Sequence, residues 1–304
     1  MPQLCRFRRG LSTPRLGLLQ DSRVLDLSAA SASALTDVDA ALHLTLEELR
    51  SAVERAAAEP LPAYELAESG LRLLPPLQGQ EVWAAGVTYL RSREARVEEA
   101  AEKSVYERVY EAERPEIFLK GGLSRTVGPN EAIRIRADST WDVPEPELAL
   151  VLNRWLELVG FTAGNDVSSR SIEGENPLYL PQAKVWMGSC ALGPAILPVW
   201  ERDPARPFRI GMRIVRAGQE VYRGETSTER MARSFAHLIE YLGRDNVFPH
   251  GVILLTGTGL VPPSDFTLEA GDEVEITVED VGTLRTPVVR GDGGYALRAS
   301  SVGA

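Results

Sequence analysis

Residues 141–152 read Trp-Asp-Val-Pro-Glu-Pro-Glu-Leu-Ala-Leu-Val-Leu, and two acids in this run decide how the chain is interpreted. Proline holds the residue before it in extended backbone conformations, so Pro144 and Pro146 favour a strand here. Residues two apart in a strand project from the same face, which places Glu145 and Glu147 roughly 6–7 Å apart along the chain. Two carboxylates on one face repel each other unless a positive charge lies between them.

A third acid, Asp166, follows at the end of the next strand-like stretch. Three carboxylates without a nearby cysteine or histidine suit a hard divalent cation, Mg²⁺ or Mn²⁺, better than zinc. Glu145, Glu147 and Asp166 are therefore the candidate metal ligands. Taken alone, the residues leave a second interpretation open, in which the glutamates cover the solvent face of an exposed strand.

The overall composition excludes several classes of protein. A net charge of −10 and a pI near 5.0 argue against binding nucleic acid or an anionic membrane, because both need basic surfaces. Two cysteines, Cys5 and Cys190, cannot form a disulfide framework. No apolar run approaches the roughly 20 residues of a membrane span, and the N-terminus lacks the features of a signal peptide. We therefore expect a cytoplasmic protein.

Lysine is rare in this chain. Of the 33 basic residues only Lys103, Lys120 and Lys184 are lysine, and the rest are arginine. Arginine does not lose its proton in a protein, whereas a buried lysine can. The two lysines of the central segment, Lys120 and Lys184, are therefore candidates for a functional role.

The pattern of strands and helices predicts an α+β protein with two parts. Residues 1–75 read as a small α+β domain, whose helix begins with a capping box at Thr45 and Glu48. Residues 76–304 read as a mostly β catalytic domain. Within it, the charged stretch 91–114 has helical spacing and is a candidate lid, although a solvated surface helix would look the same. A second capping box predicts a helix from Thr226 to about Leu242.

Several blocks of the larger part resemble the fumarylacetoacetate hydrolase family. The matching stretches are 144–151 (E-x-E-L-A), 160–170 (G-[YF]-T-x-x-N-D-V-S-A-R), Lys184 with 192–194 (K…L-G-P) and 268–284 (P-G-D…G-x-L). They occur in order over residues 80 to 290, and on this ground the chain is identified as a member of that family. The resemblance implies a small N-terminal domain, a mixed β-roll catalytic domain, a bound Mg²⁺ (or Mn²⁺), a small 2-oxo acid substrate and assembly into a homo-oligomer, a dimer or a tetramer.

One difference from the family's hydrolases reduces the number of reactions to be expected. Those hydrolases carry N-Y-x-x-H-x-x-E after the first strand, with the histidine and glutamate activating water. Here Ser92 and Ala95 stand at those two positions. The stretches 114–118, 175–182 and 256–258 instead resemble the branch of the family that dehydrates 2-keto-3-deoxy sugar acids. We therefore expect a metal-dependent lyase that converts 2-keto-3-deoxy-D-arabinonate to 2,5-dioxopentanoate.

The expected mechanism is proton transfer next to a polarised ketone. A divalent cation acts as a Lewis acid on the C2 carbonyl of a 2-oxo acid and stabilises the enolate formed when a C3 proton leaves. The resemblance assigns Lys184 and Glu116 as the catalytic pair, and which of them takes the first proton stays open. A dry pocket and a nearby cation would lower the pKa of a lysine toward neutrality. The candidate substrate-binding residues are Thr258, Lys120, Tyr89 and Gln182.

Other functions fit the same metal site. An acylpyruvate-type hydrolase, a 2-oxo acid decarboxylase or an isomerase would keep the fold and the cation but change the reaction. A non-catalytic sensor of 2-oxo acids is a third class. Retention of all three acids together with Lys184 and Glu116 argues against the sensor.

Overall fold

A long mixed β-sheet forms the framework of the computed structural model, which describes residues 1–304 except 32–33, 91–107 and 294–304. Twelve strands of the described part belong to this sheet. Its main path runs β4-β3-β2-β1-β14-β12-β11-β17-β6-β7, with β5 paired to β1 and β8 paired to β14. The strands are β1 (Gln3–Arg9), β2 (Arg15–Gln20), β3 (Arg23–Asp26), β4 (Ala63–Glu65), β5 (Leu71–Leu74), β6 (Glu81–Gly86), β7 (Glu116–Gly121), β8 (Thr126–Val127), β11 (Pro146–Leu152), β12 (Leu158–Asp166), β14 (Cys190–Pro198) and β17 (Val252–Leu255).

A second sheet packs against this framework. Its order is β16-β15-β18-β19-β9, and a separate two-stranded ribbon joins β10 to β13. These strands are β9 (Ile133–Ile135), β10 (Asp142–Val143), β13 (Ser168–Ser169), β15 (Arg209–Arg216), β16 (Gln219–Ser227), β18 (Glu273–Val278) and β19 (Gly282–Arg290). The described helices are α1 (Val38–Leu42), α2 (Leu46–Ala57), α5 (Arg170–Glu175), α6 (Leu180–Lys184) and α7 (Phe235–Gly243). The expected α+β class is confirmed.

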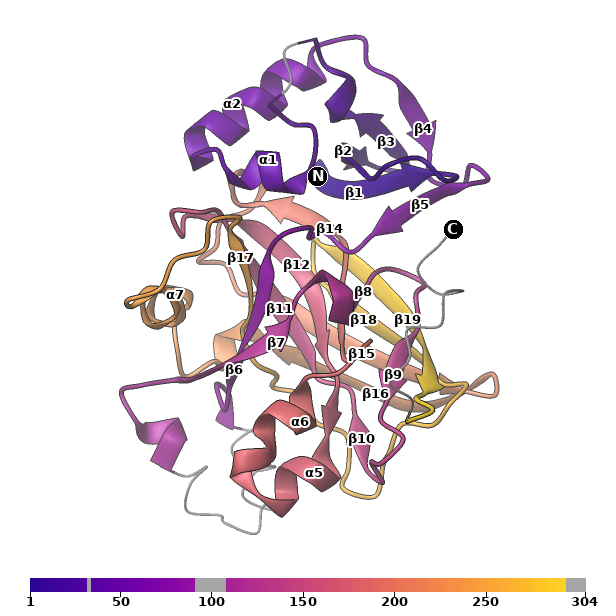
Figure 1. Cartoon of the computed structure of the whole chain (residues 1–304), viewed down its shortest axis with the longest axis vertical. Coiled ribbons are helices and arrows are strands. Elements are labelled where there is room, and N and C mark those ends of the chain that lie inside the picture. The colour runs from indigo at the N-terminus through magenta and orange to yellow at the C-terminus, as the bar shows by residue number, and fades with distance from the viewer. Residues whose placement is uncertain (32–33, 91–107, 294–304) are drawn as a thin grey trace.

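The N-terminal strands continue the sheet of the larger part. Helices α1 and α2 cover this end of the molecule, whereas α5 and α6 lie at the opposite end (Figure 1). The predicted capping box is present, with Thr45 and Glu48 satisfying each other's backbone N–H groups. Strand β1 pairs with β14 through Leu4 and Ile196, so the first 75 residues are hydrogen-bonded to the rest of the chain.

Strand β11 is buried on both faces, and this fixes its register. Leu148 and Leu150 pack into the core between the two sheets, while Ala149 points into a second apolar cluster. A buried leucine-to-alanine change costs about 2–5 kcal/mol, so the difference in side-chain size between the two faces opposes any slip of the strand. A slip by one residue would exchange the two faces of β11 and with them the side on which Glu147 projects.

The predicted start of the helix at Thr226 is wrong. Thr226 pairs with Ile210 inside strand β16, so its backbone is already committed to the sheet. A short 3-10 turn follows at Thr228–Arg230, and α7 begins only at Phe235. Its N-cap is Ser234, whose hydroxyl accepts a hydrogen bond from the backbone N–H of His237. Strand pairing thus outcompeted the local capping motif.

The candidate lid at 91–114 lies mostly outside the described residues, since only 108–114 are described, and 108–111 of these are helical. Val109 and Tyr110 in that turn pack against Val87, next to strand β6. In the part of the chain that the structure describes, every helix is too short or too polar to cross a bilayer.

Candidate active site

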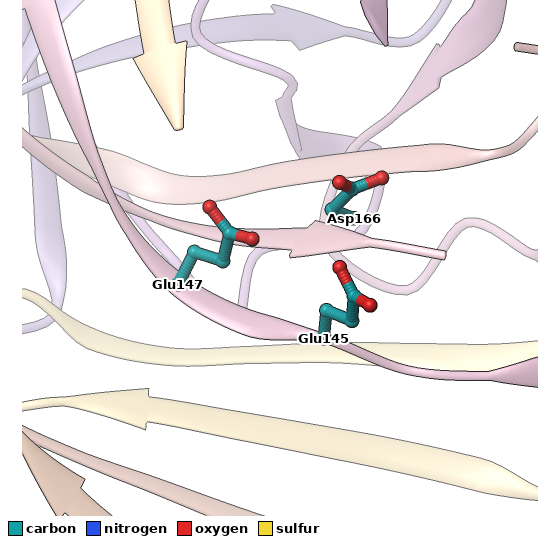
Figure 2. Close-up of side chains that lie close together, drawn as sticks. All are labelled: Glu145, Glu147 and Asp166. Carbon is teal, nitrogen blue, oxygen red and sulfur yellow. The ribbon is translucent and has the colours of Figure 1, made fainter. Parts of the chain in front are cut away.

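The three acids meet where strand β11 begins and strand β12 ends. β11 and β12 are antiparallel, with Glu147 opposite Gly164. The backbone N–H of Asp166 donates to the carbonyl of Glu145 at 3.0 Å, which places these two residues side by side. One carboxylate oxygen from each of Glu145, Glu147 and Asp166 lies within 4.8 Å of the other two (Figure 2). All three acids are buried, with exposed fractions of 3%, 1% and 1%.

Cationic side chains neutralise two of the three acids. Lys184 Nζ lies 2.8 Å from Glu145 Oε2 and 3.1 Å from Asp166 Oδ2. Arg170 Nη2 lies 2.8 Å from the other oxygen of Glu145, and Lys120 Nζ lies 2.5 Å from Asp166 Oδ1. Glu147 accepts a hydrogen bond from the backbone N–H of Gly257 at 2.6 Å, but no described cation forms an ion pair with it. The cluster is therefore short of positive charge at Glu147.

The pKa values of the acids reflect this imbalance. Burial, followed by the charges of Asp166 and Glu145, raises the pKa of Glu147 well above its ordinary value. Burial would also raise the pKa of Asp166, but the charges of Lys120 and Lys184 outweigh it and lower that pKa. A divalent cation among the three acids would supply the charge that Glu147 lacks. Oxygen donors of this kind fit Mg²⁺ or Mn²⁺.

A small recess opens beside the acids. Its walls come from β6, β7, β11, β12, α5, α6 and the loop after β17. The charged residues that line it are Glu116, Glu145, Glu147, Asp166, Glu173, Lys184 and Arg170, and its other lining residues are Ala85, Gly86, Val87, Phe118, Gly257 and Thr258. Five carboxylates against two cations make the lining strongly negative, which again fits a bound cation. The chain's three histidines are all among the described residues, and none of them lines the recess.

The predicted catalytic and binding residues divide into two groups. Lys184, Glu116 and Thr258 line the recess together with the acids, whereas Lys120, Tyr89 and Gln182 do not. The Thr258 hydroxyl donates to the carbonyl of Leu260 at 3.1 Å. The roles assigned to all six residues stay predictions.

Local geometry explains why Gln182 and Tyr89 do not line the recess. Gln182 and Lys184 are two residues apart on helix α6, about 200° around its axis, so a helix that turns Lys184 inward turns Gln182 outward. Gln182 is accordingly exposed. Tyr89 is 1% exposed and packs so closely on Gly259 that a Cβ there would overlap its ring. Direct substrate contact by Gln182 or Tyr89 therefore gains no support from the geometry.

Two residues of the recess received no role from the sequence. Arg170 and Glu173 lie on helix α5, form an ion pair at 3.1 Å and are both nearly fully buried. Arg170 closes the stretch 160–170 that carried the family resemblance, so its signal was present. Glu173 had no such signal, because only the turn of α5 brings it beside Arg170.

Asp142, three residues before Glu145, is a further buried acid with a perturbed pKa. Its exposed fraction is 0%, and burial raises the pKa of its carboxyl from 3.8 to about 6, although Ser139, Arg290 and Arg136 act in the opposite direction. The folded state therefore binds the Asp142 proton more tightly than the unfolded state between about pH 4 and pH 6.

Because of this difference, the wild-type protein should lose about 1–3 kcal/mol of folding free energy over that pH window through Asp142, and this loss should be absent from Asp142→Asn. Urea unfolding of both proteins at pH 4.5 and pH 7.5 measures the difference in stability between them. The variant should gain stability relative to the wild type as the pH rises. An equal difference at the two pH values would contradict the raised pKa.

Comparisons with known proteins agree with the fold. The family model for the fumarylacetoacetate (FAA) hydrolase C-terminal domain matches residues 81–289. A Haloferax volcanii protein named probable 2-keto-3-deoxyxylonate dehydratase is 45% identical over 277 residues, covering 90% of this chain and 95% of its own. The 2-dehydro-3-deoxy-D-arabinonate dehydratase of Saccharolobus solfataricus is 46% identical over 222 residues, covering 72% and 74%.

A solved structure extends the comparison to the whole fold. The structure of 2-keto-3-deoxy-D-arabinonate dehydratase complexed with magnesium and 2,5-dioxopentanoate superposes with a TM-score of 0.78 at 35% identity, covering 95% of this chain and 99% of that one. The family resemblance seen in the sequence is thereby confirmed, together with the expected arrangement of an N-terminal region before the catalytic β-roll. The chain belongs to the fumarylacetoacetate hydrolase family.

Proposed function

We propose that this chain is a metal-dependent hydro-lyase that dehydrates a 2-keto-3-deoxy pentonate, 2-keto-3-deoxy-D-arabinonate, to 2,5-dioxopentanoate. The observation that carries the proposal is the meeting of Glu145, Glu147 and Asp166 with Lys184 and Glu116 around one buried recess. Support comes from the dehydratases to which the chain is similar, one of them complexed with magnesium and 2,5-dioxopentanoate. A cytoplasmic location and a homo-oligomeric state belong to the same proposal, and both cysteines are free and buried.

The metal would be held by the three acids. Glu145, Glu147 and Asp166 supply oxygen donors of the kind that Mg²⁺ or Mn²⁺ prefers, and Glu147 is the acid with which none of the described cations forms an ion pair. When bound, the cation supplies Lewis acidity that polarises the C2 carbonyl of the substrate.

Two residues would move the protons of the elimination. Loss of water breaks a C3–H and the C4–O bond, so one group must accept the C3 proton and another must protonate the departing hydroxyl. Lys184 Nζ lies 2.8 Å from Glu145 and 3.1 Å from Asp166, two of the candidate metal ligands, and this supports Lys184 as the base that accepts the C3 proton. Glu116 comes from strand β7 on another wall of the recess and is the candidate donor to the C4 oxygen. A proton shift from C5 to C3 then gives the C4–C5 enol, and transfer of its O–H proton to C4 completes 2,5-dioxopentanoate.

The substrate carboxylate would be bound near Thr258. Gly257 has a φ of +90° and adjoins Thr258 at the edge of the recess, so the backbone there can approach a ligand closely. The geometry gives no reason to prefer a hydrolase, since none of the histidines lines the recess and Ser92 and Ala95 replace the residues that activate water in the family's hydrolases.

Proton NMR of the purified protein with 2-keto-3-deoxy-D-arabinonate and Mg²⁺ tests the proposal directly. We expect 2,5-dioxopentanoate to appear with Mg²⁺ and not with excess EDTA. If the substrate binds in a metal-dependent way but stays intact, the enzyme would catalyse another reaction of 2-oxo acids. Product formed equally well in EDTA would remove the metal from the mechanism.

Gly86 is expected to be essential because it makes room for Glu116. The two residues face each other across strands β6 and β7, and a Cβ on Gly86 would overlap the Glu116 carboxyl oxygen Oε2. Gly86→Ala should therefore displace this carboxyl and reduce kcat by about 10²-fold, as expected for a lost proton donor. Steady-state kinetics against Gly211→Ala provide the control, since the nearest atoms to a Cβ at Gly211 lie at 3.8 Å. Equal kinetics of the two variants would contradict the assignment of Glu116.

A further inference from the structure

Lys120 occupies an irregular position in strand β7. Strand β7 pairs antiparallel with β6, and Leu119 lies opposite Trp83 while Gly121 lies opposite Val82. Lys120 is thus the extra residue of a β-bulge. A bulge changes the direction of the side chain that it carries. Here it directs the Lys120 side chain into the interior, where its exposed fraction is 0%.

The ammonium group of Lys120 uses its three protons inside the protein. Its Nζ lies 2.5 Å from Asp166 Oδ1, donates to the carbonyl of Val167 at 2.8 Å and donates to the carbonyl of Lys184 at 2.5 Å. The same nitrogen lies 5.2 Å from the centre of the Trp186 ring. An ammonium has three donors and no acceptor. Once these three contacts are made, no proton remains for a substrate, and Lys120 does not line the recess.

The three acceptors belong to two different parts of the active site. Asp166 is a candidate metal ligand at the end of β12, and Val167 follows it directly. Lys184 is the last residue of α6, so its carbonyl lies at the negative end of that helix, where a cation is favourable. One buried ammonium therefore connects the metal-binding end of β12 with the helix end that presents the Lys184 side chain.

We infer that Lys120 is a positioning residue, which sets the distance between the metal ligand Asp166 and the proton-transferring Lys184 and does not contact the substrate. The inference rests on the proposed function, because it takes Asp166 as a ligand and Lys184 as a catalytic residue. It also explains why lysine is retained here in a chain that otherwise uses arginine. A planar guanidinium cannot direct three donors from one atom to a carboxylate and two carbonyls.

Metal binding and kinetics of Lys120→Met distinguish positioning from substrate binding. Groups that orient metal ligands typically change metal affinity by 10- to 100-fold, so calorimetry with Mn²⁺ alone should show a weakening of about that size. The visible spectrum of bound Co²⁺ should also change. At saturating metal, kcat should fall while the KM of the 2-oxo acid stays within about threefold. Unchanged Mn²⁺ affinity with a KM raised tenfold or more would overturn the inference and make Lys120 a substrate ligand.

A second measurement uses the wild-type protein and does not depend on the variant folding. Only three lysines are present, so ¹⁵N-lysine labelling should give at most three side-chain signals, assigned with Lys103→Arg and Lys184→Arg. Addition of Mg²⁺ should shift the Lys120 signal, and subsequent addition of oxalate, a mimic of the 2-oxo acid end, should shift Lys184 but leave Lys120 in place. A Lys120 signal that responds to oxalate and not to Mg²⁺ would overturn the inference.

The two proposals fail in different ways. If the wild-type protein binds Mn²⁺ and Lys120→Met weakens that binding, the positioning role stands even when no 2,5-dioxopentanoate is formed. If the wild-type protein dehydrates the substrate but Lys120→Met binds Mn²⁺ normally, only the positioning role is lost. A double variant adds a check, because Lys120→Met should have little further effect on Mn²⁺ affinity when Asp166→Asn is already present.

Discussion

Glu147→Gln is expected to abolish the dehydration, with a fall in kcat of about 10³-fold or more. The variant keeps the shape of the side chain but removes one of the three negative charges that would hold the cation. A catalytic metal supplies several kcal/mol of stabilisation to the transition state, and each 1.4 kcal/mol corresponds to a factor of ten in rate. Calorimetry with Mg²⁺ should show no binding by the variant under conditions where the wild type is saturated.

The same substitution should increase the stability of the metal-free protein, although it abolishes the activity. Because burial and the neighbouring acids raise the pKa of Glu147 on folding, the metal-free wild type loses stability as the pH rises from the ordinary pKa of a glutamate toward the raised one. Glutamine removes this cost, on the order of 1–3 kcal/mol. The metal-free variant should therefore unfold at a higher temperature than the metal-free wild type, whereas added Mg²⁺ should stabilise only the wild type.

A matched control separates the site from general effects of losing a carboxylate. Glu275→Gln makes the same change on strand β18, where Glu275 pairs with Arg213 and Arg285 outside the lining of the recess. It should retain both Mg²⁺ binding and turnover. If Glu147→Gln kept Mg²⁺ affinity, or if its metal-free form were less stable than the wild type, Glu147 would not be the uncompensated ligand.

The local part of the site could be predicted from the sequence. Side chains alternate between the two faces of a strand, so Glu145 and Glu147 lie on one face. Two prolines in residues 141–152 indicate that this stretch is a strand. The third acid needed only the assumption that the next strand returns antiparallel, and the structure pairs β11 with β12 in this way. Prediction worked where the relevant geometry is set by residues close together in the chain.

The parts of the site that depend on contacts between distant residues were harder to predict from the sequence. Lys120 was expected to bind substrate, but the bulge in β7 and the carbonyls it faces come from pairing with β6 and from helix α6, far away in sequence. Gln182 was also expected to bind substrate, but a helix of 3.6 residues per turn directs it to the side opposite Lys184. Thr226 carried a valid capping pattern, yet its pairing with Ile210 in β16 decided its conformation.

Replacing Lys184 and Glu116, the two proposed proton-transferring groups, should reduce dehydration by different amounts. Lys184→Met should reduce dehydration by about 10³–10⁴-fold and also stop exchange of the C3 protons with solvent, because the base that accepts the C3 proton is gone. Glu116→Gln should reduce dehydration by about 10²–10³-fold but still allow C3 exchange, since it removes only the donor to the departing C4 oxygen. Deuterium incorporation at C3 in D₂O, followed by NMR beside product formation, measures both steps on one sample.

Metal affinity supplies the control for Lys184→Met. In the present structure the Lys184 ammonium lies 2.8 Å from Glu145 and 3.1 Å from Asp166, where it competes with a cation for the same carboxylates. Its removal should therefore leave Mg²⁺ affinity equal to or higher than that of the wild type, so lost activity cannot be attributed to lost metal. The reverse exchange pattern, with C3 labelling kept in Lys184→Met and lost in Glu116→Gln, would instead give Glu116 the first proton transfer.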